Sequence, residues 1–190
     1  MSRIAAILAL FAWAATACAA SGVSVEAEHR EEGVAIRAHA VLEASHDTVW
    51  STLTDYDRLA EFIPGMRESH VVSRDGDAAT VAQTGEAVFL FVTVPIDVVV
   101  VSTARPPDAI DIHVLRGSLK RLDGGYRVES ATPGMITLSW EGIVEPSVPL
   151  PAFLKVPVLR ASIESQFTGM VREIERREAL RRKPFTEGSQ

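Results

Sequence analysis

Residues 152–183 read AFLKVPVLRASIESQFTGMVREIERREALRRK. The large apolar residues of the second half recur at steps of four, three and four: Ile163, Phe167, Met170 and Ile174, with Val171 beside them. This spacing places them on one face of a helix and predicts a long amphipathic helix. Such a helix must bury its apolar face against another element. Pro157 is expected to mark a kink or the start of the helix, because proline disrupts a helix interior.

The chain before this helix carries the patterns of strands. Val34, Ile36, Ala38, Ala40 and Leu42 occupy alternate positions, as in a strand with one buried face. Turn residues separate further runs of strand-forming residues, which predict strands at 67–73, 79–92, 96–103, 109–115, 120–130 and 135–145. Successive strands with short turns predict an antiparallel meander.

Two short helices are expected between the first strand and the others. Ser45 offers an N-cap and Asp47 places a negative charge in the first helical turn. Asp57 can cap the second helix, and Pro64-Gly65 ends it. A single antiparallel sheet needs cover on its apolar face, and the long helix is the natural cover. The short helices are too small to close the open end, so we expect an apolar pocket between sheet and helix.

The stretch DTVWSTLTDYDRLAEFIPG (residues 47–65) resembles the opening of the polyketide cyclase/dehydrase and coenzyme Q-binding branch of the START-like (SRPBCC) superfamily. GSLKRL at residues 117–122, the following Gly125-Tyr126 and the strand of Trp140 are similar too, so the resemblance covers about residues 34–180. It implies an α+β helix-grip fold, in which a curved antiparallel sheet of about seven strands wraps round the long C-terminal helix. It also implies a hydrophobic tunnel, since family members bind lipids, quinones, polyketides or other apolar molecules, or act through protein contacts.

Residues 1–20 have the three-part pattern of a secretory signal: Arg3, a 14-residue apolar stretch with only Thr16 polar, and then small residues. The pattern predicts a cleavable signal peptide and a periplasmic or secreted protein. The excess of arginine over lysine, with abundant alanine, indicates a bacterial source. An uncleaved anchor is one alternative. Lipidation of Cys18 is another, because Ala15-Thr16-Ala17-Cys18 weakly resembles a lipoprotein box. Residues 21–33 are expected to form a flexible tether, residues 34–183 the folded domain, and residues 184–190 a disordered tail.

Composition excludes several functional classes. A net charge of -6 argues against a general nucleic-acid binder, which needs excess positive charge to neutralise phosphates. A single cysteine cannot form an internal disulfide or a cysteine-rich zinc site, and no two histidines have the spacing of metal ligands. The sequence contains no nucleophile elbow, phosphate loop or dinucleotide fingerprint. We therefore expect no metal and no cofactor, and the lack of a catalytic motif favours a binding protein over an enzyme.

Large side chains are the candidates for the cavity wall as a set, whereas the alternative for any single one of them is that it simply packs the core. They are Trp50, Tyr56, Phe62, Phe89, Phe91, Trp140, Phe153, Phe167 and Met170. Tyr56 would present its hydroxyl to a ligand, and Phe62 would act as a gate. Arg116 follows Ile110, Ile112 and Val114 on one strand face and is expected to bind a carboxylate or phosphate head group. The alternative is that the strand ends first and Arg116 is solvated.

The leading hypothesis is a secreted or periplasmic carrier of a hydrophobic small molecule or lipid. A cyclase or dehydratase that acts on an apolar substrate in the same cavity is the second hypothesis. The third is a protein-interaction module without a ligand. The end of the long helix is basic, with Arg172, Arg176, Arg177, Arg181, Arg182 and Lys183. Such charge suits a helix C-terminus, and the alternative is contact with an anionic membrane surface.

Overall fold

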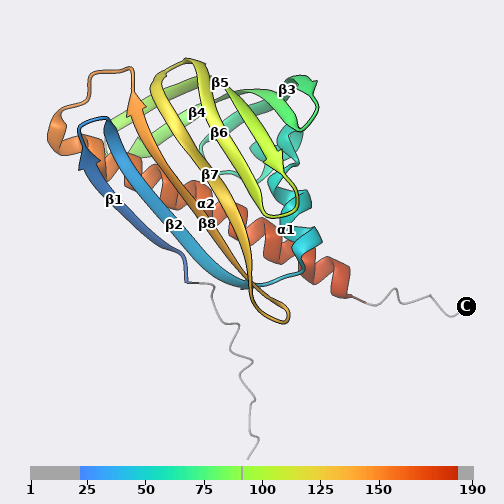
Figure 1. The fold of residues 1–190 in the computed structure, drawn as a ribbon. Coiled ribbons are helices and arrows are strands. Elements are labelled where there is room, and N and C mark those ends of the chain that lie inside the picture. The colour runs from blue at the N-terminus through green and yellow to red at the C-terminus, as the bar shows by residue number, and fades with distance from the viewer. Residues whose placement is uncertain (1–21, 91, 184–190) are drawn as a thin grey trace, which may run out of the picture.

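The structure, a computed structural model, describes residues 22–90 and 92–183. Figure 1 shows a strongly curved antiparallel sheet that wraps round the long helix α2 (Ala152–Arg182). The eight strands are β1 (Ser24–Arg30), β2 (Gly33–Glu43), β3 (Met66–Asp75), β4 (Ala78–Phe89), β5 (Val92–Arg105), β6 (Ala109–Gly117), β7 (Leu119–Thr132) and β8 (Met135–Pro146). Two short helices, α1 (His46–Leu53) and the 3-10 helix η1 (Tyr56–Glu61), lie between β2 and β3. The predicted helix-grip fold is confirmed.

The strand order in the sheet is β1-β2-β8-β7-β6-β5-β4-β3. Strands β3 to β8 form the expected meander. Strand β8, the last of the meander, pairs with β2, which precedes the meander in the chain. Within the described part of the chain, β1 and β3 are the two edge strands and do not pair with each other, so the sheet is open rather than a closed barrel. Helix α2 lies inside the curve and contacts strands near both edges, among them β1, β2 and β4.

The first strand corrects one expectation from the sequence. Residues 24–30, expected within a flexible tether over 21–33, form β1 and pair with β2 from Ser24 opposite His39 to Arg30 opposite Gly33. Val25 is buried, and its carbonyl accepts a hydrogen bond of 3.1 Å from Nε of Arg160. The strand looks polar in the sequence because an edge strand exposes charged side chains on its outer face. The signal peptide expected at 1–20 and the tail expected at 184–190 lie outside the described residues.

The helix starts between β2 and β3 are partly as predicted. The Ser45 side chain caps α1 by accepting a hydrogen bond of 3.2 Å from the Thr48 amide. Asp57 does not cap the second helix but lies within η1, where its carboxylate accepts a 2.7 Å hydrogen bond from the Val71 amide. Asp57 therefore fastens η1 to β3, an interaction between elements that a local capping pattern cannot reveal.

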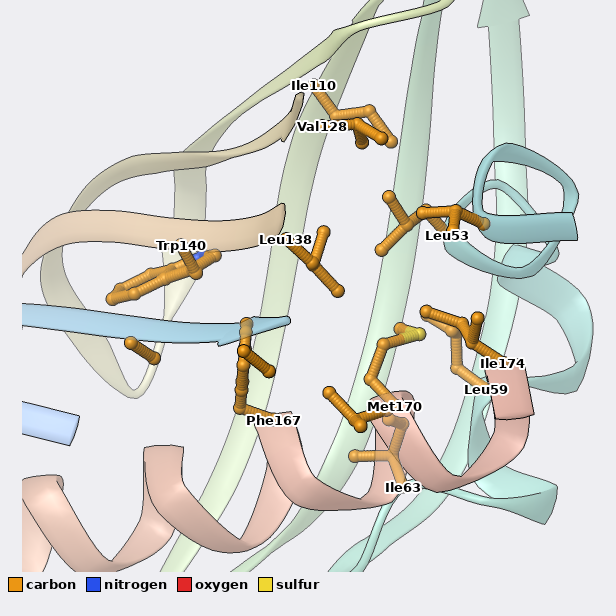
Figure 2. Packing of buried hydrophobic residues seen from close by; sticks show 14 of the residues in the cluster. Leu53, Leu59, Ile63, Ile110, Val128, Leu138, Trp140, Phe167, Met170 and Ile174 are labelled. Atoms are coloured by element: carbon orange, nitrogen blue, oxygen red, sulfur yellow. The ribbon is translucent and has the colours of Figure 1, made fainter. Parts of the chain in front are cut away.

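The core lies between the concave face of the sheet and α2. Phe167, Met170, Val171 and Ile174 of the predicted helical face are buried. Figure 2 shows Phe167, Met170 and Ile174 directed toward Leu138 and Trp140 of the sheet and Leu53 of α1. Pro157 does not start the helix, since α2 begins at Ala152 and continues through the proline. None of the helices among residues 22–90 and 92–183 combines the length and hydropathy needed to cross a bilayer.

Candidate ligand-binding cavity

Two chambers lie between the concave face of the sheet and α2. The first chamber, of about 150 Å³, is bordered by α1 and η1 through Leu53 and Leu59. The second chamber, of about 130 Å³, is bordered by the β4–β5 hairpin and the start of α2 through Ala87 and Val158. The two share five wall residues: Met66, Gln83, Leu122, Ile163 and Gln166. The chambers therefore lie end to end along α2 and form one divided cavity.

Aromatic rings form one wall of the first chamber. Tyr126 and Phe167 are stacked, with ring centroids 6.4 Å apart and an angle of 11° between the planes. Trp140 lies opposite Tyr126 in the pairing of β7 with β8 and lines the same chamber. Rings of this kind provide a large apolar contact area at low entropic cost. This wall suits a flat apolar molecule.

Two glycines make space for the Trp140 indole. Gly124 and Gly142 are paired across β7 and β8. A Cβ on Gly142 would lie 2.9 Å from Cη2 of Trp140, and one on Gly124 would lie 3.1 Å from Cζ2. Both distances are shorter than ordinary contacts of a Cβ atom. Each Cβ would also meet backbone, at 2.6 Å from the Glu141 oxygen for Gly124 and 2.8 Å from the Asp123 oxygen for Gly142. The two glycines therefore allow β7 and β8 to approach closely and leave room for the indole.

Few polar groups face the cavity, and two pairs of them are joined by hydrogen bonds. The Tyr56 hydroxyl and Ser102 Oγ are 2.8 Å apart, and Nε2 of Gln166 donates to Ser162 Oγ over 3.1 Å. Burial raises the pKa of the Tyr56 hydroxyl, although the hydrogen bond to Ser102 opposes the rise. Burial also raises the pKa of Tyr126 to about 12. Both phenols are therefore protonated at neutral pH and available as hydrogen-bond donors.

The structure distributes the predicted aromatic and methionine candidates over several environments. Those in the wall of the first chamber are Tyr56, Trp140, Phe167 and Met170. Trp50, Phe62 and Phe89 are half-buried and pack against the core without lining either chamber. Phe153 is 78% exposed at the start of α2, where it faces solvent instead of the cavity. Phe91 lies outside the described residues.

Phe62 does not have the position expected of a gate. Its ring lies beneath the guanidinium of Arg177, whose carbon is 5.3 Å from the ring centroid. A cation above an aromatic face is an attractive arrangement. Phe62 thus helps to hold the end of η1 against α2, and the side chains that border the first chamber there are Leu59 and Ile63.

Arg116 is exposed, so the expectation that it points inward is wrong. A β-bulge causes the difference, because Val100 pairs with Val114 whereas its neighbour Val99 pairs with Arg116. Leu115 is the extra residue between these pairs. Val100 lines the first chamber, so the adjacent Val99 and its partner Arg116 belong to the face of the sheet turned away from α2. Among residues 22–90 and 92–183, therefore, no arginine lines the cavity to bind a head group.

Four wall residues of the first chamber that the sequence analysis missed carry polar groups: Gln83, Ser102, Tyr126 and Gln166. Gln83 could have been found, because it interrupts an alternation of apolar residues in β4 that includes Ala79, Val81 and Ala87. Gln166 follows Ile163 by three residues and so flanks the apolar face of α2. Ser102 carries a similar signal, because it follows Val98 and Val100 at alternate positions of β5.

A carboxylate of α2 fastens α1, which borders the first chamber, to the long helix. Glu178 accepts hydrogen bonds of 2.6 Å from Thr48 Oγ1 and 3.1 Å from Ser45 Oγ, and its side chain is only 2% exposed. Ion pairs with Arg181 and Arg182 add to these contacts and hold the pKa of Glu178 far below its usual range. These interactions fasten the N-terminus of α1 to α2.

A second cluster fastens η1 to α2. Arg177 lies 2.8 Å from Asp55 and 2.7 Å from Glu173. Hydrogen bonds from Arg176 and Arg177 lower the pKa of Glu173 to about 2, against the opposing effect of burial. Four arginines of the basic helix end are thus paired with acids of the chain itself. Contact of this helix end with a membrane stays a prediction.

Among residues 22–90 and 92–183, no group of three or more potential metal ligands comes together.

A family model described as polyketide cyclase / dehydrase and lipid transport matches residues 42–171. No curated protein sequence matches the chain. The chain is similar in structure to the Zhui aromatase/cyclase from Streptomyces sp. R1128, with a TM-score of 0.65, 12% identity and coverage of 81% of this chain and 98% of that one. It is also similar to a STAR-related lipid transfer protein from Xanthomonas axonopodis, with a TM-score of 0.64, 14% identity and coverage of 82% and 94%. A third similar structure, TTHA0849 from Thermus thermophilus, has a TM-score of 0.65, 13% identity and coverage of 78% and 99%.

Proposed function

Because the chain belongs to the polyketide cyclase / dehydrase and lipid transport family, we propose that it is a carrier that binds a hydrophobic small molecule in the divided cavity. The main support is the cavity itself, whose walls are apolar over most of their area and are provided by both the sheet and α2. A protein that acted only through surface contacts would gain stability by filling this space, since cavities destabilise a core.

The chemistry of the walls favours a carrier over a cyclase or dehydratase. Such an enzyme needs a general acid or base with a pKa near the working pH. The one ionisable carboxylate that lines either chamber, within the ranges that the structure describes, is Glu86, and it is paired with Arg67. The phenols of Tyr56 and Tyr126 have raised pKa values, so they stay protonated at neutral pH and cannot accept a proton there. Hydroxyl and amide groups of this kind can orient a ligand without transforming it.

Extraction of the purified protein, followed by mass spectrometry of the extract, tests the proposal. We expect one apolar compound per protein molecule, chemically unchanged after prolonged incubation. Leu122→Trp places an indole where the two chambers meet and should abolish this co-purification. Val72→Trp makes the same kind of change at an exposed position in β3 and should retain it. Equal ligand content in both variants, or conversion of the compound by the protein, would contradict the carrier proposal.

We further propose that the carrier works outside the cytoplasm after removal of residues 1–20. The charged start, the apolar stretch and the small residues near Ala20 support this location. N-terminal sequencing of the protein from the cell envelope or medium of a bacterial host should find a start near Ser21. Recovery of the chain with Met1 intact from the cytosol would rule out this location and leave the carrier proposal standing.

A further inference from the structure

Two polar side chains in the cavity have no hydrogen-bond partner within the part of the chain that the structure describes. They are the Gln83 amide, which borders both chambers, and the Tyr126 hydroxyl, which borders the first. Every fully buried side-chain nitrogen or oxygen among the described residues does have a partner. The polar atoms of Gln83 and Tyr126 are therefore not fully buried, and they lie in chamber walls that a water molecule can reach. A ligand that displaces this water must supply a new partner, because a buried polar group left without one costs about 1–3 kcal/mol.

The position of Gln83 on the apolar face of its strand also supports a role in ligand binding. It lies on the concave face of β4, between Gly85 and the buried Val81, where an apolar residue would continue the pattern. Gln166 reaches the same junction of the chambers from α2, with its amide nitrogen bonded to Ser162. An amide both donates and accepts hydrogen bonds, and a phenol does so too. The junction thus offers directional polar contacts in an otherwise apolar space.

The charges around the cavity restrict the ligand further. No lysine, arginine or histidine lines either chamber within the described ranges, and Glu86 is already engaged by Arg67. A carboxylate, a phosphate or an ammonium group would be buried without a counter-charge, which is strongly unfavourable. Arg116, the expected partner for such a head group, lies on the opposite face of the sheet. The walls therefore select an uncharged molecule.

The size and shape of the two chambers also limit which ligand can bind. A dry apolar cavity of about 150 Å³ accommodates one benzene-sized ring, which is the size of the first chamber. Together the two chambers lie near the lower end of the range of about 300–1,000 Å³ that is typical of small-molecule sites. The stacked Tyr126 and Phe167 rings border the first chamber with flat apolar surface.

From these observations we infer that the ligand is a neutral, flat molecule of about two rings that carries a carbonyl or hydroxyl oxygen. Gln83 and the Tyr126 hydroxyl bind this oxygen, and the aromatic wall holds the rings. The inference rests on the proposed carrier function and narrows it to one chemical class. It excludes ligands whose charged group lies inside the chambers, such as a fatty acid bound with its carboxylate innermost.

Three probes of one shape test the inference on the full chain after removal of bound ligand. They are 1-acetonaphthone, a neutral ketone; 1-ethylnaphthalene, the hydrocarbon of similar shape; and 1-naphthoate, an anion. Isothermal titration calorimetry should show the ketone binding about tenfold or more tightly than the hydrocarbon, because only the ketone satisfies a buried polar group. The anion should bind more weakly than either.

Substitutions test whether Gln83 and Tyr126 cause the preference for the ketone over the hydrocarbon. Gln83→Leu and Tyr126→Phe should each reduce the ratio of ketone to hydrocarbon affinity at least threefold, and both should leave hydrocarbon binding intact or improved. Thr80→Val, a polar-to-apolar change on the other face of β4, should leave the ratio unchanged. Intact hydrocarbon binding in each variant shows that its cavity is still folded.

Three outcomes would overturn the inference. They are equal binding of ketone and hydrocarbon to the unchanged protein, tighter binding of the anion, and a ratio that both substitutions leave unaltered. If no probe binds but an apolar compound is extracted from the purified protein, the ligand class is wrong and the carrier function stands. If no probe binds and the extract is also empty, the carrier function falls as well.

Discussion

At the scale of single residues, Gly169 determines how closely η1 approaches α2. A Cβ at this buried position would lie 2.4 Å from Cδ of Pro64 and 2.7 Å from the carbonyl oxygen of Phe62. The second contact is with backbone, which cannot move aside as a flexible side chain can. Glycine costs a helix about 1 kcal/mol relative to alanine. Its presence here therefore reflects the packing of the segment after η1.

We expect Gly169→Ala to lower the free energy of unfolding by about 1–3 kcal/mol, as overpacked cores do, although alanine is the better helix former. Urea denaturation measures the change. Ser165→Ala at an exposed position of the same helix serves as the control and should have little effect. A more stable Gly169→Ala protein would show that the Pro64 segment moves away without cost.

At the scale of elements, the contact of α1 with α2 depends on one buried carboxylate. Glu178 accepts hydrogen bonds from the N-cap Ser45 and from Thr48 while it pairs with Arg181. It thus joins the N-terminus of α1 to the last turns of α2. Because Leu53 of α1 borders the first chamber, this joint also fixes one end of the cavity.

Glu178→Gln keeps the shape of the side chain and removes its charge. We expect it to lower the free energy of unfolding by about 2 kcal/mol, since hydrogen bonds to charged groups contribute about 1.5–3 kcal/mol. Glu164→Gln removes an exposed partner of Arg160 in the same helix and should cost less than about 1 kcal/mol. Equal costs in the two variants would show that Glu178 does not fasten α1.

The same carboxylates predict how stability depends on pH. The pKa of Glu173 is lowered to about 2, and that of Glu178 is also lowered. A lowered pKa in the folded state contributes stability above the pKa of the unfolded chain, and this contribution is lost as pH falls through the folded value. Urea denaturation should therefore show stability falling between about pH 5 and pH 2. Glu173→Gln should flatten this fall, and an unchanged slope would refute the assignment.

At the scale of the whole molecule, the sheet and α2 surround a space that they do not fill. Helix α2 contacts β1 and β2 near one edge of the sheet and β4 near the other. The strands in the middle of the sheet lie farther from α2, and the chambers occupy the space between them and the helix. A bound ligand would therefore connect sheet and helix and stabilise the folded chain as a whole.

Removal of the co-purified ligand should lower the melting temperature. A ligand at about a hundred times its Kd stabilises a protein by about 2.7 kcal/mol, which corresponds to a shift of several degrees for a domain of this size. Calorimetry before and after extraction measures the shift, and adding the extract back should restore it. A melting temperature that is the same with and without the extract would argue against ligand binding in the cavity.

Much of this architecture is predictable because its signals are local. The apolar face of α2, the alternation in β2 and the Ser45 cap each depend on neighbours along the chain, and the structure has all three. The resemblance at residues 47–65 added the connection between elements, and the family match confirms it. The cavity walls were predictable only in part: large side chains such as Trp140 and Phe167 line a chamber, whereas Trp50 packs beside it.

The sequence by itself determined the elements and the kind of surface that each presents, because the 3.6-residue and two-residue periods are properties of a single segment. Tertiary structure alone decided which side chains meet. The bulge at Leu115 turned Arg116 outward, and pairing with β2 made residues 24–30 a strand. Helix α2 placed Gln166 in the same cavity wall as Gln83. Each of these outcomes depends on a partner distant in the chain. No pattern within one segment records the register or the position of such a partner.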